Sequence, residues 1–478
     1  MNQDRPPFDH DEGAPTGSTW QRPGPRPYPR GVLPILAVAL VVSLLTNLLL
    51  VSRLEDERAD VAALRRSVAE QQAALDTLRG DVRGTSDDPL VQISAAVERI
   101  RSLSFRERIE PELLTSAQLA ARVRGSFRDD NDRAEFEANQ QVLEVLGLIA
   151  PGTDLWSLIQ AANEEQIGGF YDSDKGVMVV EARDATKLGS LDRFVLAHEF
   201  THAVTDQHFD LSRLDDLQEK RADDEAFAYL SLVEGDAQLV SELYVGSVLT
   251  QDEQLELLRE AEGISTTRFD ALPEYLREVY EFPYRSGVDF VRALHRQGGF
   301  ATVNGAYRDP PVSTEQIMHP NRYIATRDDP VAVRLPDLRA RLGGGWRRID
   351  GGGIGELDVL LIADHGAQSI TRTDARRAAA GWDGGAYVGL RSGDDVLVAM
   401  LTAWDSQAEA REAVALFERW LPLRFANVGS AFDAGSNAKG WESPDGAGIV
   451  ARDGDRMVLL VGPSRGSVER AAAAFSSN

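Results

Sequence analysis

The 478-residue sequence predicts an α+β protein built from five successive segments. Three features lead to this prediction: an uncharged apolar run near the N-terminus, long stretches of helical periodicity in the middle, and interleaved strand and helix patterns near the C-terminus. The predicted segments are a disordered tail (1–30), a transmembrane helix (31–52), a coiled-coil stalk (53–84), a mainly helical domain with a small β-hairpin (85–325) and a small α+β domain (350–478).

Composition narrows the classes of partner and chemistry. The formal net charge of −25 argues against nucleic acid as a partner, because phosphate binding needs a basic patch. The absence of cysteine excludes disulfides, thiol catalysis and cysteine zinc sites.

The first 84 residues predict a membrane anchor. Residues 1–30 are rich in proline and charge, and residues 31–52 contain no charge over a length that would span a bilayer. A cleaved signal peptide is the rival interpretation, but its small-residue pattern at 37–39 lies inside the apolar run. The sequence therefore favours a single uncleaved transmembrane helix, with the catalytic domain expected outside the cytoplasm.

The segment that follows shows a heptad pattern. A coiled coil here would make the protein a homodimer, and a single amphipathic stalk helix is the alternative. The apolar a and d positions are Leu54, Val61, Leu64, Val68, Leu75, Leu78 and Val82.

The motif HEFTH, His198 to His202, predicts a metal site. Two histidines four residues apart share one face of a helix, and Glu199 lies beside them as a candidate general base. The segment Ser190–Gln207 is mostly apolar, with Asp192 in its first turn, so we expect a buried helix whose histidines need partners. Zn²⁺ would satisfy both, and His198 and His202 are the expected ligands.

A third ligand is expected from the next helix, 222–249. Glu234 lies on its apolar stripe, where a carboxylate is costly unless it is paired or binds a metal. Glu225 and Glu242 lie closer to the polar flanks. Glu234 is therefore the preferred ligand, with Asp206 and Asp236 as candidates to orient the histidines.

These residues resemble the active-site helix of thermolysin-like gluzincins. His198 to Asp206, HEFTHAVTD, carries that resemblance, which implies a zincin-like metallopeptidase with His198, His202 and Glu234 as ligands and Glu199 as base. In this chain, however, the downstream glutamate lies in the pattern Val-Glu-Gly-Asp. A looser resemblance, through EGDA at 234–237 and PPVSTEQIMHP at 310–320, is to uncharacterised bacterial HExxH proteins.

Two further features would complete such a site. The runs around the turn 172–176 predict a β-hairpin over 166–180, and an exposed strand edge there could bind an extended substrate or serve packing alone. For transition-state stabilisation the preferred residue is His319, ahead of Tyr284 and Tyr307.

The predicted function is a membrane-anchored zinc metalloendopeptidase acting on a protein or peptide substrate. A catalytically inactive scaffold with a degenerate peptidase fold is the alternative, and hydrolysis of a non-peptide amide is a third reading. The C-terminal region predicts a ββαββα order, with strands at 386–390, 396–403, 448–451 and 457–461 and helices at 406–420 and 467–475.

Overall fold

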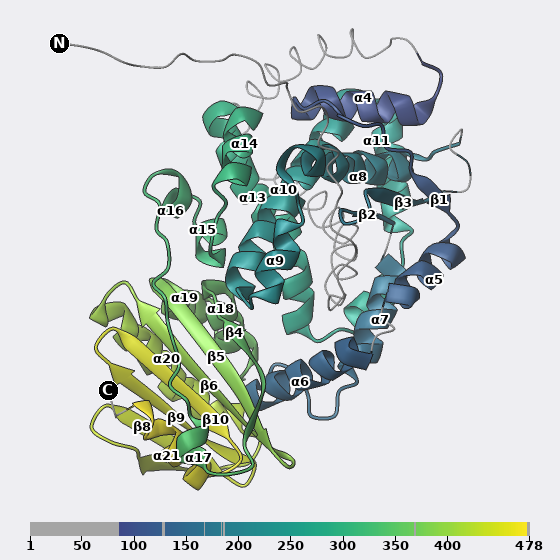
Figure 1. The fold of residues 1–478 in the computed structure, drawn as a ribbon. Coiled ribbons are helices and arrows are strands. Elements are labelled where there is room, and N and C mark those ends of the chain that lie inside the picture. The colour runs from purple at the N-terminus through teal and green to yellow at the C-terminus, as the bar shows by residue number, and fades with distance from the viewer. Residues whose placement is uncertain are drawn as a thin grey trace, which may run out of the picture.

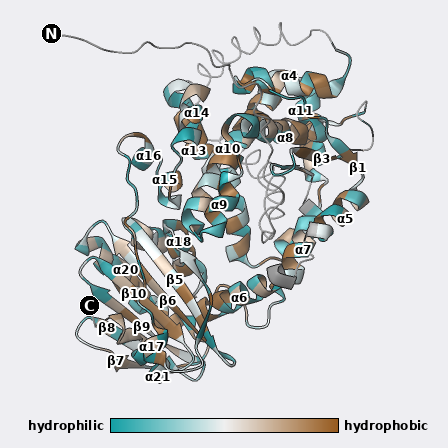
Figure 2. Cartoon of the chain, in the orientation of Figure 1, coloured by the Kyte–Doolittle hydropathy of each residue, from teal (hydrophilic) through white to brown (hydrophobic). Residues whose placement is uncertain are grey.

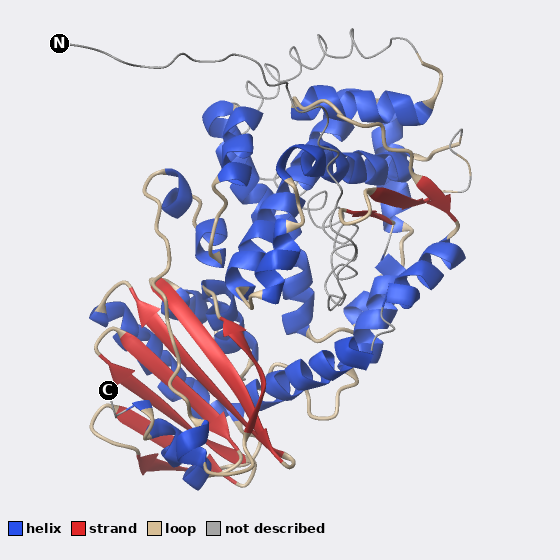
Figure 3. Ribbon diagram, viewed as in Figure 1, coloured by secondary structure: helices blue, strands red, loops and turns tan. Residues whose placement is uncertain are grey.

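The structure, a computed structural model, describes residues 86–126, 130–166, 168–182, 184, 187–367 and 370–475. Helices dominate the described residues from 86 to 342, and the strands gather mostly in the C-terminal part (Figures 1 and 3). The two parts are in contact, because helix α6 (Asp130–Leu146) packs against strands of the C-terminal sheet.

The helical part surrounds two long helices, α10 (Asp223–Val248) and α13 (Glu274–Gly298), which pack side by side. A small sheet, with strand order β1-β3-β2, lies beside α8 (Ser190–Phe209). Its strands are β1 (Glu112–Leu114), β2 (Gly169–Asp172) and β3 (Val177–Glu181). The other helices are α4 (Pro89–Arg101), α5 (Ser116–Ser126), α7 (Leu155–Gln166), α9 (Arg213–Glu219), α11 (Gln251–Glu262), α12 (Thr267–Asp270), α14 (Phe300–Arg308), α15 (Thr314–Met318), α16 (Asn321–Ile324) and α17 (Arg339–Leu342).

The C-terminal part is a seven-stranded antiparallel sheet in the order β4-β5-β6-β10-β9-β8-β7. It is larger than the predicted ββαββα unit, which lacked β4, β7 and β8. The strands are β4 (Arg347–Gly353), β5 (Trp382–Ser392), β6 (Asp395–Trp404), β7 (Ser430–Asp433), β8 (Ala438–Ser443), β9 (Gly446–Asp453) and β10 (Arg456–Gly462). The helices are α18 (Glu356–His365), α19 (Arg372–Ala379), α20 (Gln407–Arg424) and α21 (Arg465–Ala472).

Both faces of the central strands are covered. Along β6, Val398 and Met400 join the large core that continues into the helical part, whereas Leu397 and Ala399 face a smaller core closed by α17 and α21. This alternation follows from the two-residue period of a strand. Figure 2 shows the resulting apolar colour along β6.

One glycine pair fixes the central helices at close range. A Cβ atom on Gly235 of α10 would overlap the backbone of Gly287 of α13, and a Cβ on Gly287 would overlap Ser231. The absence of side chains at these positions lets the two backbones meet. Gly235 thus sets the spacing between α10 and α13.

The predicted membrane-anchored fold and extracytoplasmic location need correction. Among the residues that the structure describes, no helix is long and apolar enough to cross a membrane. The long helices α10 and α13 carry charged side chains such as Glu234 and Glu278, which are costly to place in hydrocarbon. The predicted tail (1–30), transmembrane helix (31–52) and coiled-coil stalk (53–84) lie outside the described residues.

Candidate metal centre

Helix α8 carries the HEFTH motif deep in the helical part. It begins at Ser190, with Gly189 as N-cap, and the Gly189 N–H donates to the Asp192 carboxylate at 2.9 Å. This bond, the half of a capping box that glycine can make, satisfies the N–H group of the N-cap residue. Both sides of the following helix are buried, including His198 and Glu199. The four-residue spacing brings the His198 and His202 rings to a centroid separation of 4.6 Å.

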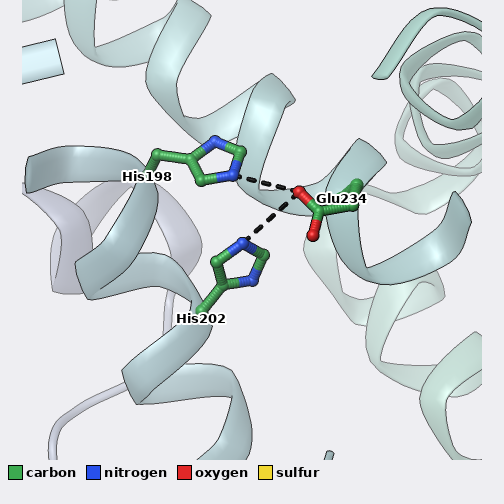
Figure 4. A group of neighbouring side chains, drawn as sticks. All are labelled: His198, His202 and Glu234. Atoms are coloured by element: carbon green, nitrogen blue, oxygen red, sulfur yellow. Dashed lines mark hydrogen bonds and ion pairs between the residues drawn. The ribbon is translucent and has the colours of Figure 1, made fainter. Parts of the chain in front are cut away.

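Glu234 approaches both histidines from the neighbouring helix α10. Its Oε2 atom lies 3.1 Å from Nε2 of His198 and 3.5 Å from Nε2 of His202. Figure 4 shows the two imidazoles, both from α8, converging on the single carboxylate of α10. The sequence-predicted ligands His198, His202 and Glu234 are therefore brought together, with one donor atom from each within 4.8 Å of the others.

The three side chains form a charge-coupled group. Burial lowers the pKa of His198 to about 4, so this imidazole is neutral. Burial opposes the charged form of His202 too, but the carboxylate of Glu234 outweighs it and raises the pKa of His202 to about 9. Burial also works against ionised Glu234, yet the adjacent histidines lower its pKa to about 2. The cluster therefore has one anionic acceptor between two imidazoles.

The separations fit a tetrahedral metal ion. Ligand atoms bonded to tetrahedral zinc at about 2.0–2.1 Å lie about 3.3 Å from one another. The observed 3.1 and 3.5 Å lie on either side of that value. Two imidazoles and one carboxylate are also a donor set that catalytic zinc accepts. These two separations and the donor set thus fit Zn²⁺, and the third separation is at most 4.8 Å.

Glu199 lies beside this cluster and does not join it. Its Oε2 atom is buried and has no hydrogen-bond partner, whereas its carboxylate accepts from the backbone N–H of Tyr171 on β2. Burial raises the pKa of Glu199 to about 7. A carboxyl group that titrates near neutrality can both take up and release a proton.

All four residues line a cavity of about 70 Å³ below the strand β2. Tyr284 of α13 forms part of the wall, with its ring stacked on His198 at a centroid distance of 6.2 Å and its hydroxyl group bonded to Glu234. Burial raises the pKa of Tyr284 well above its usual value, so the hydroxyl remains a donor. The remaining wall residues include Gly169, Phe170, Tyr171, Ser173, Leu211, Leu214, Asp215, Leu230 and Val233.

Strand β2 is the edge of the small sheet on the side of the cavity. It pairs with β3 on one side, and β1 pairs with the other side of β3. Within the described residues no strand pairs with the second side of β2. The backbone there can accept an added extended chain.

The structure does not bring His319 to this cavity. Its Nε2 atom bonds to Glu356 at 3.0 Å, and its side chain is 45% exposed. The neighbouring Glu315 pairs with Arg322, and Thr314 donates to Asp224. The PPVSTEQIMHP segment therefore packs the helical part against α18.

The expected orienting residues also have other partners. Asp206 accepts from the hydroxyl of Tyr171 and from the N–H of Leu211. Asp236 forms a buried ion pair with Arg101 at 2.9 Å and accepts from the hydroxyl of Tyr307.

Sequence reasoning missed the contribution of the α9 region. Leu211, Leu214 and Asp215 line the cavity, because the chain folds back across its mouth between α8 and α10. No spacing or motif in this short polar stretch points to such a role. The hydrogen bond from the backbone N–H of Tyr171 was also missed, because nearly every residue has such a donor and the sequence does not single one out.

Two other groups of acidic and histidine side chains lie together in the described residues. One consists of Glu274, Glu278 and His365, and the other of Asp328, Asp383 and Asp405. Arg372 already pairs with Glu278, and Arg322 pairs with both Asp328 and Asp405. These arginines supply the positive charge that a metal would otherwise bring.

Comparison with known proteins gives one match, in the C-terminal part. A family model described as a domain of unknown function (DUF8575) matches residues 347–472, from the start of β4 to the end of α21. Searches of curated proteins and of solved structures find no match. The matched region does not contain His198, His202 or Glu234, so the zinc assignment depends on the geometry of the helical part.

Proposed function

We propose that this protein is a zinc-dependent peptidase whose metal is held by His198, His202 and Glu234. The observation that carries the proposal is the convergence of three donor atoms from two helices, next to the buried carboxyl of Glu199. A bound zinc ion would lower the pKa of a water molecule and polarise the substrate carbonyl.

Glu199 is the proposed general base. It takes a proton from the attacking water and passes it to the departing amine. Its raised pKa of about 7 supports this exchange, because the group can hold or release the proton near neutral pH. Its unpartnered Oε2 atom leaves one oxygen available for the water.

Tyr284 and β2 complete the proposed site. The Tyr284 hydroxyl is a buried donor at the cavity wall, and it replaces His319 as the candidate to stabilise the negative charge that develops on the carbonyl oxygen. The edge of β2 that no described strand pairs with is suited to align an extended peptide by main-chain hydrogen bonds, apart from the Tyr171 N–H, which donates to Glu199. Substrate class follows from this edge: a chain with a free backbone, such as an unfolded or loop segment of a protein.

The test is a Glu199→Gln variant of the full chain, loaded with zinc and assayed on casein. We expect it to retain its zinc and to lose activity by about 10²- to 10⁴-fold, because it keeps the shape of the site and lacks the base. Glu219→Gln, at an exposed position of α9, is the matched control and should cleave at the wild-type rate.

Two results would reject the proposal. A Glu199→Gln protein that cleaves casein as fast as wild type would remove the base from the mechanism. A zinc-loaded wild-type protein that cleaves neither casein nor a mixture of peptides would favour a non-catalytic binding protein instead.

A further inference from the structure

A second cavity lies where the C-terminal sheet meets the start of α10. Its volume is about 350 Å³, and its walls come from α6, α10, α13, α18 and the sheet. Glycines make this junction tight: a Cβ on Gly352 would overlap the Asp223 carboxylate, and one on Gly355 would overlap that of Asp224. The close approach surrounds the first residues of α10 with protein.

One end of this cavity is acidic, and Asp224 is its most deeply buried carboxylate. Only 8% of Asp224 is exposed. Its Oδ1 atom accepts from the N–H of Thr314 at 3.0 Å and from the Thr314 hydroxyl at 2.6 Å. Its Oδ2 atom is buried in the cavity wall with no hydrogen-bond partner. An unpartnered buried carboxylate oxygen is costly, so this atom indicates a missing donor.

The nearby basic residue does not supply that donor. Arg221 directs its two terminal nitrogens to Glu135 and Asp350, each at 2.6 Å. Its Nε atom lies 3.6 Å from Asp223. Arg221 also lines this cavity, but in the ion pairs of the described residues neither Asp224 nor Asp358 has a cationic partner. Burial raises the pKa of Asp224 to about 7, as expected where no cation compensates the charge.

Much of the rest of the cavity wall is apolar, with polar contributions from Asn139, Arg221, Tyr275, Thr314 and Tyr387. Leu143 and Leu146 come from α6, Phe227 from α10 and Val279 from α13, while Leu357 comes from α18. Such walls favour a hydrocarbon body over a hydrated ion. A metal ion is a poor occupant too, because Asp223, Asp224 and Asp358 are not among the groups whose donor atoms converge.

We propose that this cavity binds a small organic ammonium ion, with the charged nitrogen at Asp224 and an apolar chain against α6 and α13. The Oδ2 atom is covered by protein in this structure, so the Asp224 carboxylate would turn to meet the ammonium group, and the hydrocarbon would cover the leucine and valine side chains. This inference does not depend on the proposed peptidase activity, since none of its residues lines the cavity of His198 and Glu234.

The experiment compares hexylammonium with 1-hexanol, a neutral molecule of similar shape, by calorimetric titration of the full chain. We expect saturable binding of hexylammonium and at least about tenfold weaker binding of hexanol, which lacks the charge, a difference of about 1.4 kcal/mol. Asp224→Asn should weaken hexylammonium binding at least about tenfold and leave hexanol binding unchanged. Asp394→Asn, in the exposed β5–β6 turn, is the matched control and should bind as wild type does.

A second variant tests the apolar end. Val279→Phe should fill the space for the hydrocarbon and abolish binding of hexylammonium. If Asp224→Asn shows no cooperative unfolding transition and so is not folded, Val279→Phe alone tests the proposed site. The proposal is overturned if hexylammonium shows no saturable binding at millimolar concentrations, if hexanol binds equally well, or if folded variants at both positions bind as wild type does.

Discussion

Asp224 and Glu234 are buried carboxylates on the same helix, α10, yet their surroundings drive them in opposite directions. Glu234 faces two histidines, which lower its pKa to about 2. Asp224 faces Thr314 and other acids, and burial raises its pKa to about 7. A third buried carboxylate of α10, Asp236, has a different partner again, the guanidinium of the buried Arg101. The comparison shows that burial alone does not decide the charge of a carboxylate, because its partners do.

The comparison also separates two kinds of site along one helix. Glu234 stays ionised next to two imidazoles, which is the arrangement of a shared metal ligand. Asp224 has only neutral donors and acidic neighbours, so a cation from solution could bind to it. The middle of α10 therefore serves the proposed chemistry, and its N-terminus serves the proposed amine site.

The largest stability effect is expected at the ion pair of Asp236. Asp236→Ala should leave Arg101 as an uncompensated buried charge and lower the free energy of unfolding by about 3–5 kcal/mol. Urea unfolding of the full chain measures this. Asp289→Ala, which removes an exposed pair with Arg292, should cost about 1 kcal/mol or less. Equal losses in both variants would contradict the buried pairing.

A smaller, pH-dependent effect is expected at Asp224. Its folded-state pKa of about 7 exceeds the ordinary value of 3.8, so protonation favours the folded state. That stabilisation is complete below about pH 4 and is lost as the pH rises through 7. Relative to Asp224→Asn, wild type should therefore lose about 2–3 kcal/mol between pH 5 and pH 8. Urea unfolding at both pH values measures this. If the free energy of unfolding changed equally with pH in wild type and in Asp224→Asn, the raised pKa of Asp224 would be contradicted.

The smallest effect concerns the spacing of α10 and α13. Gly235→Ala should lower stability by about 1–3 kcal/mol, because the new methyl group meets the backbone of Gly287. Gly246→Ala on the same helix has open space around it and should raise stability by up to about 1 kcal/mol, because alanine favours helices. Thermal unfolding of both variants distinguishes packing from helix propensity; a stabilised Gly235→Ala protein would contradict the close contact.

Much of the helical frame around the metal centre was readable from the sequence. The apolar run from Ser190 predicted α8 to within two residues of its end at Phe209, because the periodicity of apolar residues is a local signal. Glu234 was identifiable because a carboxylate on an apolar stripe needs a partner. The partner of Asp236 was not, since Arg101 lies 135 residues away and no local rule joins the two.

The sheet shows the same division. Strands β6 and β10 are near-continuous apolar runs and were predicted, whereas β4 contains Gly351, Gly352 and Gly353 and was not. Glycine weakens the sequence pattern of a strand. In β4, Gly352 is needed because this edge of the sheet lies so close to the start of α10 that a side chain there would overlap it. His319 was preferred because it follows a proline-flanked loop, and in the structure it bonds to Glu356 of α18, away from the cavity of His198 and Glu199.

The most direct test of the central claim is the zinc content of the purified full chain and of two ligand variants. Wild type should bind one zinc ion per chain by elemental analysis after dialysis, and His198→Ala and Glu234→Ala should each bind almost none, because three protein ligands are needed to hold the ion. Folding of the variants is checked by circular dichroism. A wild-type protein without zinc, or folded variants with the same zinc content as wild type, would contradict the assignment of His198, His202 and Glu234 as the metal centre.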